Sequence, residues 1–557
     1  MAAKGRRKFL KQVGGLAGGA AVAGRLSASR VASDSNRAEN ALILREIAAE
    51  SEGERPAAST ATNNDEELYP NKIASFSKGL PHSQLGEVDL TAYHSVLTAL
   101  STQKHSDAES ILIGNGRKLV NLEGAFTYDM EGGDSHTFTA APAPAFASAQ
   151  AAAEMVELYW QALARDVPFT QWNTSPVIQN VVAEINGLGA YQGPRDGSGQ
   201  VTAANVFRGS ATGCLTGPYI SQYLMQTIYV GSTPREQMYR TGVAGVDYLT
   251  NYSEWLAVQS GSLPTSAEQF DPALQYVRNG RDLAQFVHYD YLVQAFLQAA
   301  IFISNSYPET VLYYNLYQLN HTSPYKTSRI QTPFTTFCAP HVEDWIGRAA
   351  GLALKAAWYN KWAVHRRLRP ETYGGRVYST LKGATSYPVP ASLLQSQAVN
   401  AVVQSNGGAL LPQAYVEGCP LHPSYPAAHA AVAAACATVM KAIFEETSVI
   451  APTMTLSGDG TTLIPYTDLP LTIGGELNKL AFNVSMGRNW AGVNYRSDIT
   501  TGYMIGEEAA MCFLRDQVNT LSESFTGFSF TKFDGTPVSI APGTGPYTGL
   551  NILTPGS

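Results

Sequence analysis

Five long stretches with the spacing of amphipathic helices constrain the fold of this 557-residue chain more than any other feature of its sequence. Within residues 145–165, Val156, Tyr159, Trp160 and Leu163 fall on one helical face because they follow the i, i+3, i+4, i+7 pattern. The same kind of spacing recurs over residues 282–304, 343–363, 426–446 and 498–521. Helices of this length predict a protein in which helices pack as bundles.

Two local signals refine this expectation. Pro426 is expected in the first turn of the fourth helix, where its missing N–H leaves no helical bond unmade. The C-terminal segment FSFTKFDGTPVSI alternates like a strand and contains an Asp534-Gly535 turn, so it predicts a small hairpin. The expected fold class is therefore all-α, with minor β-hairpins.

Composition and charge exclude several classes of protein. With 45% hydrophobic and 15% charged residues, the chain has the composition of a well-buried globular protein rather than a disordered one. Its net charge of −7 gives no reason to expect nucleic acid as a partner. Its five cysteines show neither CxxC spacing nor an even number, which argues against a disulfide framework or a zinc site.

The N-terminal residues 1–33 are predicted to lie outside the fold as a signal segment. RRKFLK at residues 6–11 resembles the twin-arginine export motif, and the glycine-rich apolar run 13–24 that follows is too short to span a bilayer. We expect export by a twin-arginine-type route, a cytoplasmic location if the signal is vestigial, and no membrane partner. Residues 34–65 are predicted as a flexible linker, and residues 66–557 as one helical domain.

The first functional cluster is KWAVHRRLRP at residues 361–370. Its five basic residues within nine positions, from Lys361 to Arg369, give at least one face of a helix end a strong positive charge. One interpretation is a solvated basic helix end, where cations complement the helix dipole. The other is the cationic wall of a site.

The second cluster is CPLHPSYPAAH, which contains His422 and His429 and precedes an alanine-rich helix. A proline-rich loop entering a helix presents free N–H groups that suit an anion. Either histidine is equally compatible with a packed loop position.

The third cluster is SMGRNWAGVNYRSD, in which Arg488 is followed by Asn494 and then by Asp498. If Asn494 lies on a helix, Asp498 falls on the same face four residues later. Asp498 is also compatible with a simple capping role at the start of the following helix.

In this order, the three clusters resemble the vanadium-dependent haloperoxidase and acid-phosphatase superfamily. The first is similar to its Lys…Arg-Pro segment through Lys361 and Arg369, and PSYPAAH is similar to its Pro-Ser-Gly-His segment. The third is similar to its Arg-x5-His-x3-Asp pattern, with Asn494 at the histidine position. The offset from Lys361 to Arg369 resembles the algal bromoperoxidase branch, as do YPNKIASFSKGLPH and LYWQALARDVPF. The resemblance implies two four-helix bundles around one site, and a homo-oligomer, for which we expect a dimer.

Three departures from the family pattern fall on positions that contact the oxyanion. The resemblance implies that Lys, two Arg, a Ser hydroxyl and a Gly amide hold vanadate, and that a His nitrogen bonds vanadium. Ala427 stands at the serine position and cannot donate, while Ala428 adds a Cβ at the glycine position. Asn494 has no basic lone pair for a metal. We therefore expect no metal and no cofactor, and we expect Asn494, Ala427 and Ala428 to contact substrate instead.

The remaining residues resemble a vanadium-independent branch of haloperoxidase homologues in bacterial naphthoquinone meroterpenoid pathways. The implied reaction is an α-hydroxyketone rearrangement with a 1,2-prenyl shift on a prenylated naphthoquinone-type intermediate in antibiotic biosynthesis. His429 or His422 is the expected base, and Lys361, Arg369 and Arg488 are the expected carbonyl and oxyanion stabilisers.

Two other hypotheses remain open at the level of sequence. One is a vanadium-dependent chloro- or bromoperoxidase with a degenerate vanadate site, in which His422 or another group substitutes as the metal ligand. The other is a catalytically silent binding or scaffold homologue.

Overall fold

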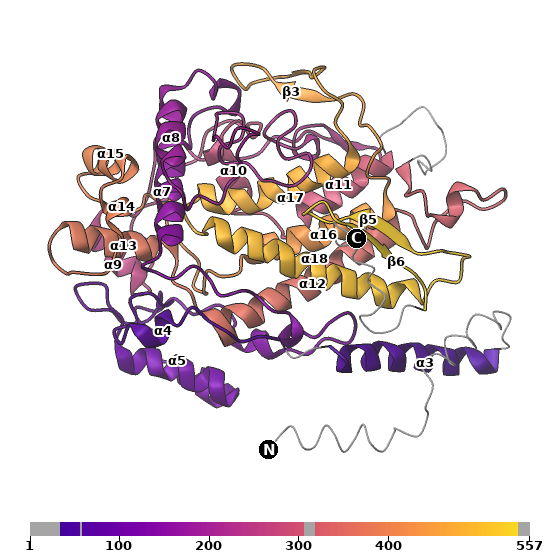
Figure 1. The fold of residues 1–557 in the computed structure, drawn as a ribbon, viewed down its shortest axis with the longest axis horizontal. Helices are drawn as coiled ribbons and strands as arrows, with labels where there is room; N and C mark the ends of the chain where they lie inside the picture. Colours follow the sequence, from indigo (N-terminus) through magenta and orange to yellow (C-terminus); the bar gives the residue numbers. More distant parts are fainter. Residues whose placement is uncertain (1–33, 56–57, 306–317, 544–557) are drawn as a thin grey trace.

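The structure is a computed structural model of the chain, and it describes residues 34–55, 58–305 and 318–543 (Figure 1). This part is mostly helical and contains small two-stranded antiparallel sheets, which confirms the predicted fold class. Within it, no helix combines the length and apolar character needed to cross a membrane. The predicted signal segment 1–33 lies outside the described residues.

Four long helices form the centre of the molecule: α12 (Ala339–Tyr359), α16 (Ala428–Ile443), α17 (Ile473–Trp490) and α18 (Arg496–Val518). The alanine-rich α16 packs against the other three (Figure 1). Its approach to α18 is so close that a Cβ on Gly506 would lie 2.0 Å from a carbonyl oxygen of α16. Small residues on both helices therefore bring the N-terminus of α16 beside the start of α18.

The other described elements surround this centre. The α-helices are α3 (Asp34–Gly53), α4 (Asp65–Leu68), α5 (Leu90–Thr102), α6 (His105–Ala108), α7 (Ala149–Ala164), α8 (Pro176–Asn186), α9 (Tyr252–Gln259), α10 (Gly280–Phe286), α11 (Gln294–Asn305), α13 (Pro370–Leu381), α14 (Ala391–Leu394) and α15 (Gln397–Asn406). Short 3₁₀ helices are η1 (Leu122–Phe126), η2 (Ser135–Thr137), η3 (Phe169–Gln171), η4 (Gln222–Leu224) and η6 (Pro324–Lys326). The strands pair as β1 (Ile228–Val230) with β2 (Thr233–Arg235), β3 (Met454–Leu456) with β4 (Leu463–Pro465), and β5 (Phe528–Thr531) with β6 (Pro537–Ile540).

Four of the five predicted helices are confirmed as α7, α12, α16 and α18. The fifth prediction, a single helix over 282–304, is wrong because the chain forms α10 and α11 with a turn over 287–293 between them. Val287 at one side of the turn and Phe296 in α11 are both buried in the same core. The apolar spacing therefore continues across the turn and hides it.

No apolar periodicity in the sequence predicts α17, which carries Arg488 in its last turn. All of its residues from Ile473 to Trp490 are buried, and buried polar residues such as Lys479 and Asn483 interrupt the apolar spacing that would reveal the helix. The placement of Pro426 in the first turn of α16 is also wrong, since that helix begins at Ala428.

The predicted C-terminal hairpin is confirmed as β5 and β6, in which Phe528 pairs with Ile540. Gly535 adopts a φ of +88° in the turn, a conformation that glycine accepts without strain. The inward residues of both strands are buried, so the hairpin covers one side of the helical core.

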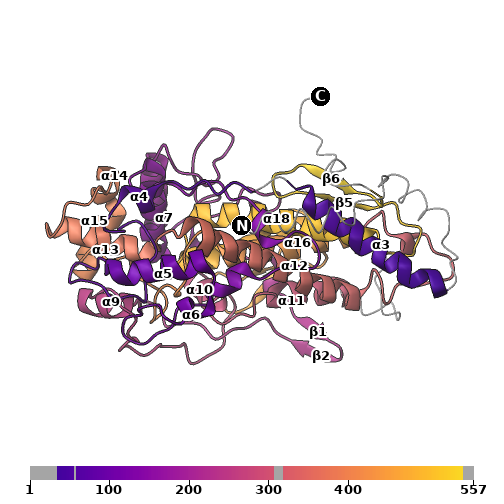
Figure 2. The same cartoon turned by 90° about the horizontal axis from the view of Figure 1, so that it is seen from below.

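Residues 34–55 differ from the predicted flexible linker because they contain the 20-residue helix α3. Arg55, just after this helix, donates from Nη2 to Glu508 of α18 at 2.6 Å. α3 and the α13–α15 group lie toward opposite ends of the long axis in both views (Figures 1 and 2). The single-domain assignment of 66–557 stays a prediction.

Candidate active site

The first basic cluster is buried. α12 ends in a π-helical segment, η7 (Asn360–His365), and α13 begins immediately after Arg369. Lys361 and Arg369 are both 0% exposed. The hypothesis of a solvated basic helix end is therefore wrong, and charges buried to this extent require partners or a function.

Lys361 points at the loop that precedes α16. Its Nζ donates to the carbonyl oxygens of Pro423, at 2.8 Å, and Ser424, at 2.7 Å. Burial, together with the charges of Arg369 and Arg488, lowers the pKa of Lys361 well below its usual value. The amino group of Lys361 is thus buried beside two other cations.

Arg369 and Arg488 reach the same site from two other elements. Nη1 of Arg369 donates to the carbonyl oxygen of Val493 at 2.8 Å, and Nη1 of Arg488 donates to that of Val287 at 3.1 Å. Within the described residues, Nε of Arg488 has no hydrogen-bond partner. We call Lys361, Arg369 and Arg488 the cradle cations. In the part of the chain that the structure describes, none of them forms an ion pair with a carboxylate.

His422 lies against the cradle cations as an uncharged ring. Nη2 of Arg369 is 3.0 Å from its Nδ1 and 3.3 Å from its Nε2, and Nδ1 is 3.1 Å from the carbonyl oxygen of Pro423. Burial, and then the charges of Arg369, Lys361 and Arg488, lower the pKa of His422 well below its usual value. A ring with this pKa is a weak base at neutral pH.

His429 has a different environment in the first turn of α16. Its Nε2 lies 3.1 Å from Oδ1 of Asp290, a residue of the turn between α10 and α11. The side chain of Asp290 is 5% exposed and that of His429 is 17% exposed. No group of the described residues makes a hydrogen bond to Nδ1 of His429. The aspartate therefore fixes the ring and leaves Nδ1 free to accept a proton.

Asn494 lies in the loop between α17 and α18 and not on a helix. Its Nδ2 donates to the carbonyl oxygen of Ser424 at 3.1 Å and to Oδ2 of Asp498 at 2.8 Å. An amide nitrogen has two hydrogens to donate, so both are used. The carbonyl Oδ1, which accepts no hydrogen bond from the described residues, is the group left for a ligand.

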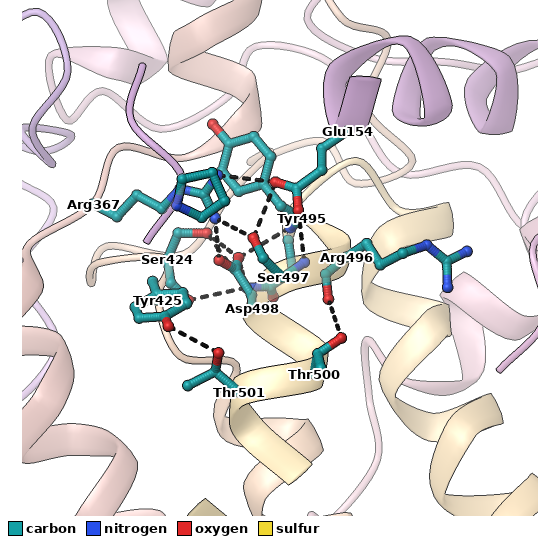
Figure 3. Close-up of polar contacts among 12 residues, drawn as sticks. Glu154, Arg367, Ser424, Tyr425, Tyr495, Arg496, Ser497, Asp498, Thr500 and Thr501 are labelled. Carbon is teal, nitrogen blue, oxygen red and sulfur yellow. Dashed lines mark hydrogen bonds and ion pairs between the residues drawn. The ribbon is translucent and has the colours of Figure 1, made fainter. Parts of the chain in front are cut away.

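A buried polar network holds Asp498 in place (Figure 3). Its carboxylate accepts from Nη1 of Arg367 at 2.9 Å and from Oγ of Ser424 at 2.5 Å. Nη2 of Arg367 also donates to Glu154 of α7 at 3.0 Å. Asp498 accepts in addition from the backbone N–H of Tyr495, the N-cap residue of α18, so it caps this helix, but from the third helical position rather than at the predicted helix start.

The two alanines of the second cluster lie where α16 begins. Ala427 is the N-cap residue, and its backbone N–H donates to the carbonyl oxygen of Asp498 at 2.9 Å. Ala428 starts the helix, and the first N–H groups of a helix have no partner inside it. The helix start therefore adds partial positive charge near the cradle cations.

The comparisons with known proteins identify the family. Residues 346–520 match a family model described as the VCPO second helical-bundle domain. The chain is 34% identical over 528 residues to a vanadium-dependent bromoperoxidase of Ascophyllum nodosum, with 90% of this chain and 92% of that protein covered. The chain belongs to the vanadium haloperoxidase family.

Further relatives agree with this assignment. A vanadium-dependent bromoperoxidase of Corallina pilulifera is 30% identical over 600 residues, which cover 91% of this haloperoxidase-family chain and 98% of the relative. The homohexameric structure of the second vanadate-dependent bromoperoxidase (AnII) of Ascophyllum nodosum matches with a TM-score of 0.87 at 29% identity, over 92% and 91% of the two chains. The resemblance predicted from the three clusters is confirmed for the family, while membership of the vanadium-independent branch remains a proposal.

The residues present do not fit vanadate as the family holds it. Nδ2 of Asn494 is committed to Ser424 and Asp498, and its remaining oxygen would face the oxygens of an oxyanion. Ala427 offers no hydroxyl. His422 is no substitute ligand, because in the tautomer that donates from Nδ1 to Pro423, its Nε2 accepts from Arg369. The cradle cations suit negative charge, but the donor set supplies no nitrogen ligand at the Asn494 position.

Sequence reasoning missed three residues that position this site: Asp290, Arg367 and Glu154. Arg367 is part of the first cluster, but its spacing does not distinguish a paired arginine from a cradle cation. Asp290 was placed inside a predicted helix, and Glu154 on a helix without a role. No local sequence signal connects these residues with His429 or Asp498, because they meet only in the folded chain.

Proposed function

We propose that this haloperoxidase-family chain is a vanadium-independent isomerase. The proposed reaction is an α-hydroxyketone rearrangement with 1,2-prenyl migration on a prenylated naphthoquinone-type intermediate of meroterpenoid antibiotic biosynthesis. The observation that carries the proposal is the commitment of Asn494 Nδ2 to Ser424 and Asp498, beside cations that lack a carboxylate partner. Such a site is suited to negative charge on an organic oxygen rather than to a metal bond.

Each step assigns a proton or an electron pair to a named group. Nδ1 of His429 removes the proton of the tertiary hydroxyl group. As the resulting alkoxide becomes a carbonyl, the prenyl carbon moves with its bonding electrons to the adjacent carbonyl carbon. The oxygen of that carbonyl takes up the negative charge next to the cradle cations, and it then receives the proton from His429. The product is an isomer, so the balance requires no oxidant or reductant.

The environment of the two histidines supports His429 as the base. Asp290 orients its ring and stabilises the imidazolium that forms during the reaction. Proton uptake by His422 is opposed by the neighbouring cations. We propose that His422 holds Arg369 in place, and that Oδ1 of Asn494 accepts a hydrogen bond from a substrate hydroxyl group. Ala427 and Ala428 would present small apolar surfaces to the substrate.

A vanadium-dependent bromoperoxidase with an altered vanadate site is the second candidate. The comparisons favour this candidate over the isomerase, since the relatives at 30–34% identity are named vanadium-dependent bromoperoxidases. The cradle cations are also compatible with an oxyanion. The hydrogen bonds of Asn494, in contrast, favour the isomerase. The experiment must therefore test both activities on the same protein.

The test is incubation of the purified full chain with a C-prenylated α-hydroxyketone naphthoquinone, without peroxide or halide. We expect a rearranged product of unchanged mass, identified by NMR, and at least a roughly tenfold loss of turnover in His429→Ala. In parallel, the protein is loaded with orthovanadate, with Asn494→His/Ala427→Ser/Ala428→Gly as a matched variant that restores the family pattern. Stoichiometric vanadium in the wild type, together with peroxide-dependent bromination, would overturn the isomerase proposal.

We also propose a homo-oligomer. The related bromoperoxidase is described as homohexameric, whereas the expected dimer and the export route stay predictions. Light scattering of the purified chain distinguishes a dimer from a hexamer.

A further inference from the structure

The turn between α10 and α11 contacts two chemically different parts of the site. At one end, the carbonyl oxygen of Val287 accepts a hydrogen bond from Nη1 of Arg488 at 3.1 Å. At the other end, Oδ1 of Asp290 lies 3.1 Å from Nε2 of His429. These two contacts are three residues apart in the chain, so a shift of the turn would displace both the proposed base and a cradle cation.

His288 lies between these two residues and is held on three sides. Its Nε2 is 2.7 Å from Oε1 of Glu417, and its Nδ1 is 3.3 Å from Oε1 of Glu268. Its ring stacks on Tyr415, with ring centroids 3.8 Å apart and planes within 8° of parallel. The side chain of His288 is 10% exposed.

The contacts of His288 suit a charged ring. Within the described residues Nε2 makes a hydrogen bond to Glu417, while Nδ1 lies at ion-pair distance from Glu268 without a hydrogen bond. An imidazolium carries a proton on each nitrogen and so matches a carboxylate on either side. Burial acts to lower the pKa of His288, but the neighbouring carboxylates of Glu268 and Glu417 outweigh it, so the pKa is raised. The other titratable or charged groups that face this cluster are Tyr289, Arg240, Lys78, Tyr415 and Arg488.

We propose that His288 is a positioning residue: as an imidazolium held between Glu268 and Glu417, it fixes the turn so that Asp290 orients His429 and Val287 orients Arg488. His288 itself acts through these residues and contacts no reacting atom. The inference rests on the proposed function, because it concerns the placement of the same base and the same cation.

The position of His288 has a consequence for pH dependence. The charged ring is present below its folded pKa, and the contacts to the two carboxylates weaken as the pH rises through that value. Turnover by the wild type should therefore fall over this range as the turn loosens. A variant without the titrating ring should lack this part of the pH–rate profile.

The experiment is a double-mutant cycle of His288→Gln and Asp290→Asn on the full chain. His288→Gln keeps the approximate size and one donor but removes the charge, and we expect kcat to fall by roughly tenfold, since misplacement by about 1 Å can cost up to 10²-fold. Asp290→Asn should lower kcat as well. If His288 acts in part through Asp290, the double variant loses clearly less than the product of the two single losses, whereas independent effects multiply.

His105→Gln is the matched control, because His105 is an exposed histidine whose Nδ1 also pairs with a carboxylate, Glu123, at 3.1 Å. It should leave kcat and the pH–rate profile unchanged. If His288→Gln does not fold, Glu268→Gln tests the same cluster, because Glu268 makes the longer of the two carboxylate contacts of His288. Unchanged kcat in every folded variant of the cluster, or multiplicative effects in the cycle, would overturn the proposal.

An activity-independent measurement separates this inference from the proposed function. Solid-state NMR of the protein with ¹⁵N-labelled histidine reports the protonation of each ring nitrogen of His429, assigned by its absence in His429→Ala. We expect a wild-type signal for a proton on Nε2 facing Asp290, and a mixture of tautomers in His288→Gln. Identical His429 signals in both proteins would sink the positioning role, even where the isomerase is active. A changed signal without isomerase activity would sink only the proposed function.

Discussion

Two groups of buried cations in this molecule differ in their partners. Arg367 lies between Asp498, at 2.9 Å, and Glu154, at 3.0 Å, and Nε of Arg496 donates to Glu157 at 2.9 Å. We call Arg367 and Arg496 the paired arginines. The cradle cations, in contrast, donate to carbonyl oxygens and other uncharged groups in the described part of the chain.

The pKa values of the paired arginines shift in the direction opposite to those of Lys361 and Arg369. Burial acts to lower the pKa of Arg367 and Arg496, but the adjacent carboxylates outweigh it and raise both pKa values. For Lys361 burial prevails, and it lowers the pKa of Arg369 to about 10. A buried charge that is paired serves the folded state, while three buried cations that gather in one place without a counter-charge mark a place for a ligand. The presence or absence of a carboxylate partner therefore distinguishes structural cations from cations of the site, which residue type alone does not.

The largest effect is expected from Arg367→Met, which leaves the carboxylates of Asp498 and Glu154 without their shared partner. Breaking a buried ion pair from one side costs about 3–5 kcal/mol. We expect a loss of this size in the free energy of unfolding, measured by urea denaturation. A loss under about 1 kcal/mol would show that Arg367 does not belong to the scaffold group.

Lys361→Met should give the opposite result. Removal of a charge that lacks a counter-ion should leave the free energy of unfolding unchanged or raise it, while turnover falls by about 10²–10³-fold, as for other electrostatic stabilisers. Lys441→Met is the control, because Lys441 is equally buried but donates to Thr531 of β5. The control should retain turnover. Strong destabilisation by Lys361→Met would place Lys361 with the scaffold.

The pH dependence of Lys361 sharpens the same contrast. Because its folded pKa is lowered, the cradle loses this charge at a lower pH than an exposed lysine would, and affinity for orthophosphate should fall there. Between the folded pKa and about 10.4, the ordinary lysine value, the unfolded chain binds more protons than the folded one, so this group makes the protein more stable as the pH rises. Calorimetric titration with phosphate measures the affinity across this pH range, and urea denaturation measures the stability. Neither trend should persist in Lys361→Met.

The smallest effect is expected from Ala427→Ser, which restores a hydroxyl beside the cradle. One additional hydrogen bond contributes about 1 kcal/mol, so affinity for orthophosphate should rise by about fivefold. Ala391→Ser, at the start of α14, is a control that adds a hydroxyl elsewhere. Equal phosphate affinity in wild type and Ala427→Ser would indicate that this position does not face the anion.

The sequence predicted those parts of the fold that leave a local pattern. Helices such as α7 and α18 are predicted by the apolar spacing within their own segments. The hairpin around Gly535 is predicted in the same way, by the alternation of its strands and by the Asp534-Gly535 turn. α17 was missed because buried polar residues interrupt its apolar spacing, and the turn at 287–293 was missed because the apolar spacing continues through it. The three clusters identified the family, but not which of their residues are paired.

The order of the three basic or histidine-bearing segments, and the interruption of the family pattern by Asn494, Ala427 and Ala428, can be read from the residues alone. The folded chain is needed to see that Arg367 is paired and Lys361 is not, and that His429, unlike His422, has an aspartate at its ring. The reason is physical, since charge compensation and proton affinity depend on groups within a few ångströms in space. Asp290 and Glu154 reach the site from chain segments more than a hundred residues away from the residues they orient.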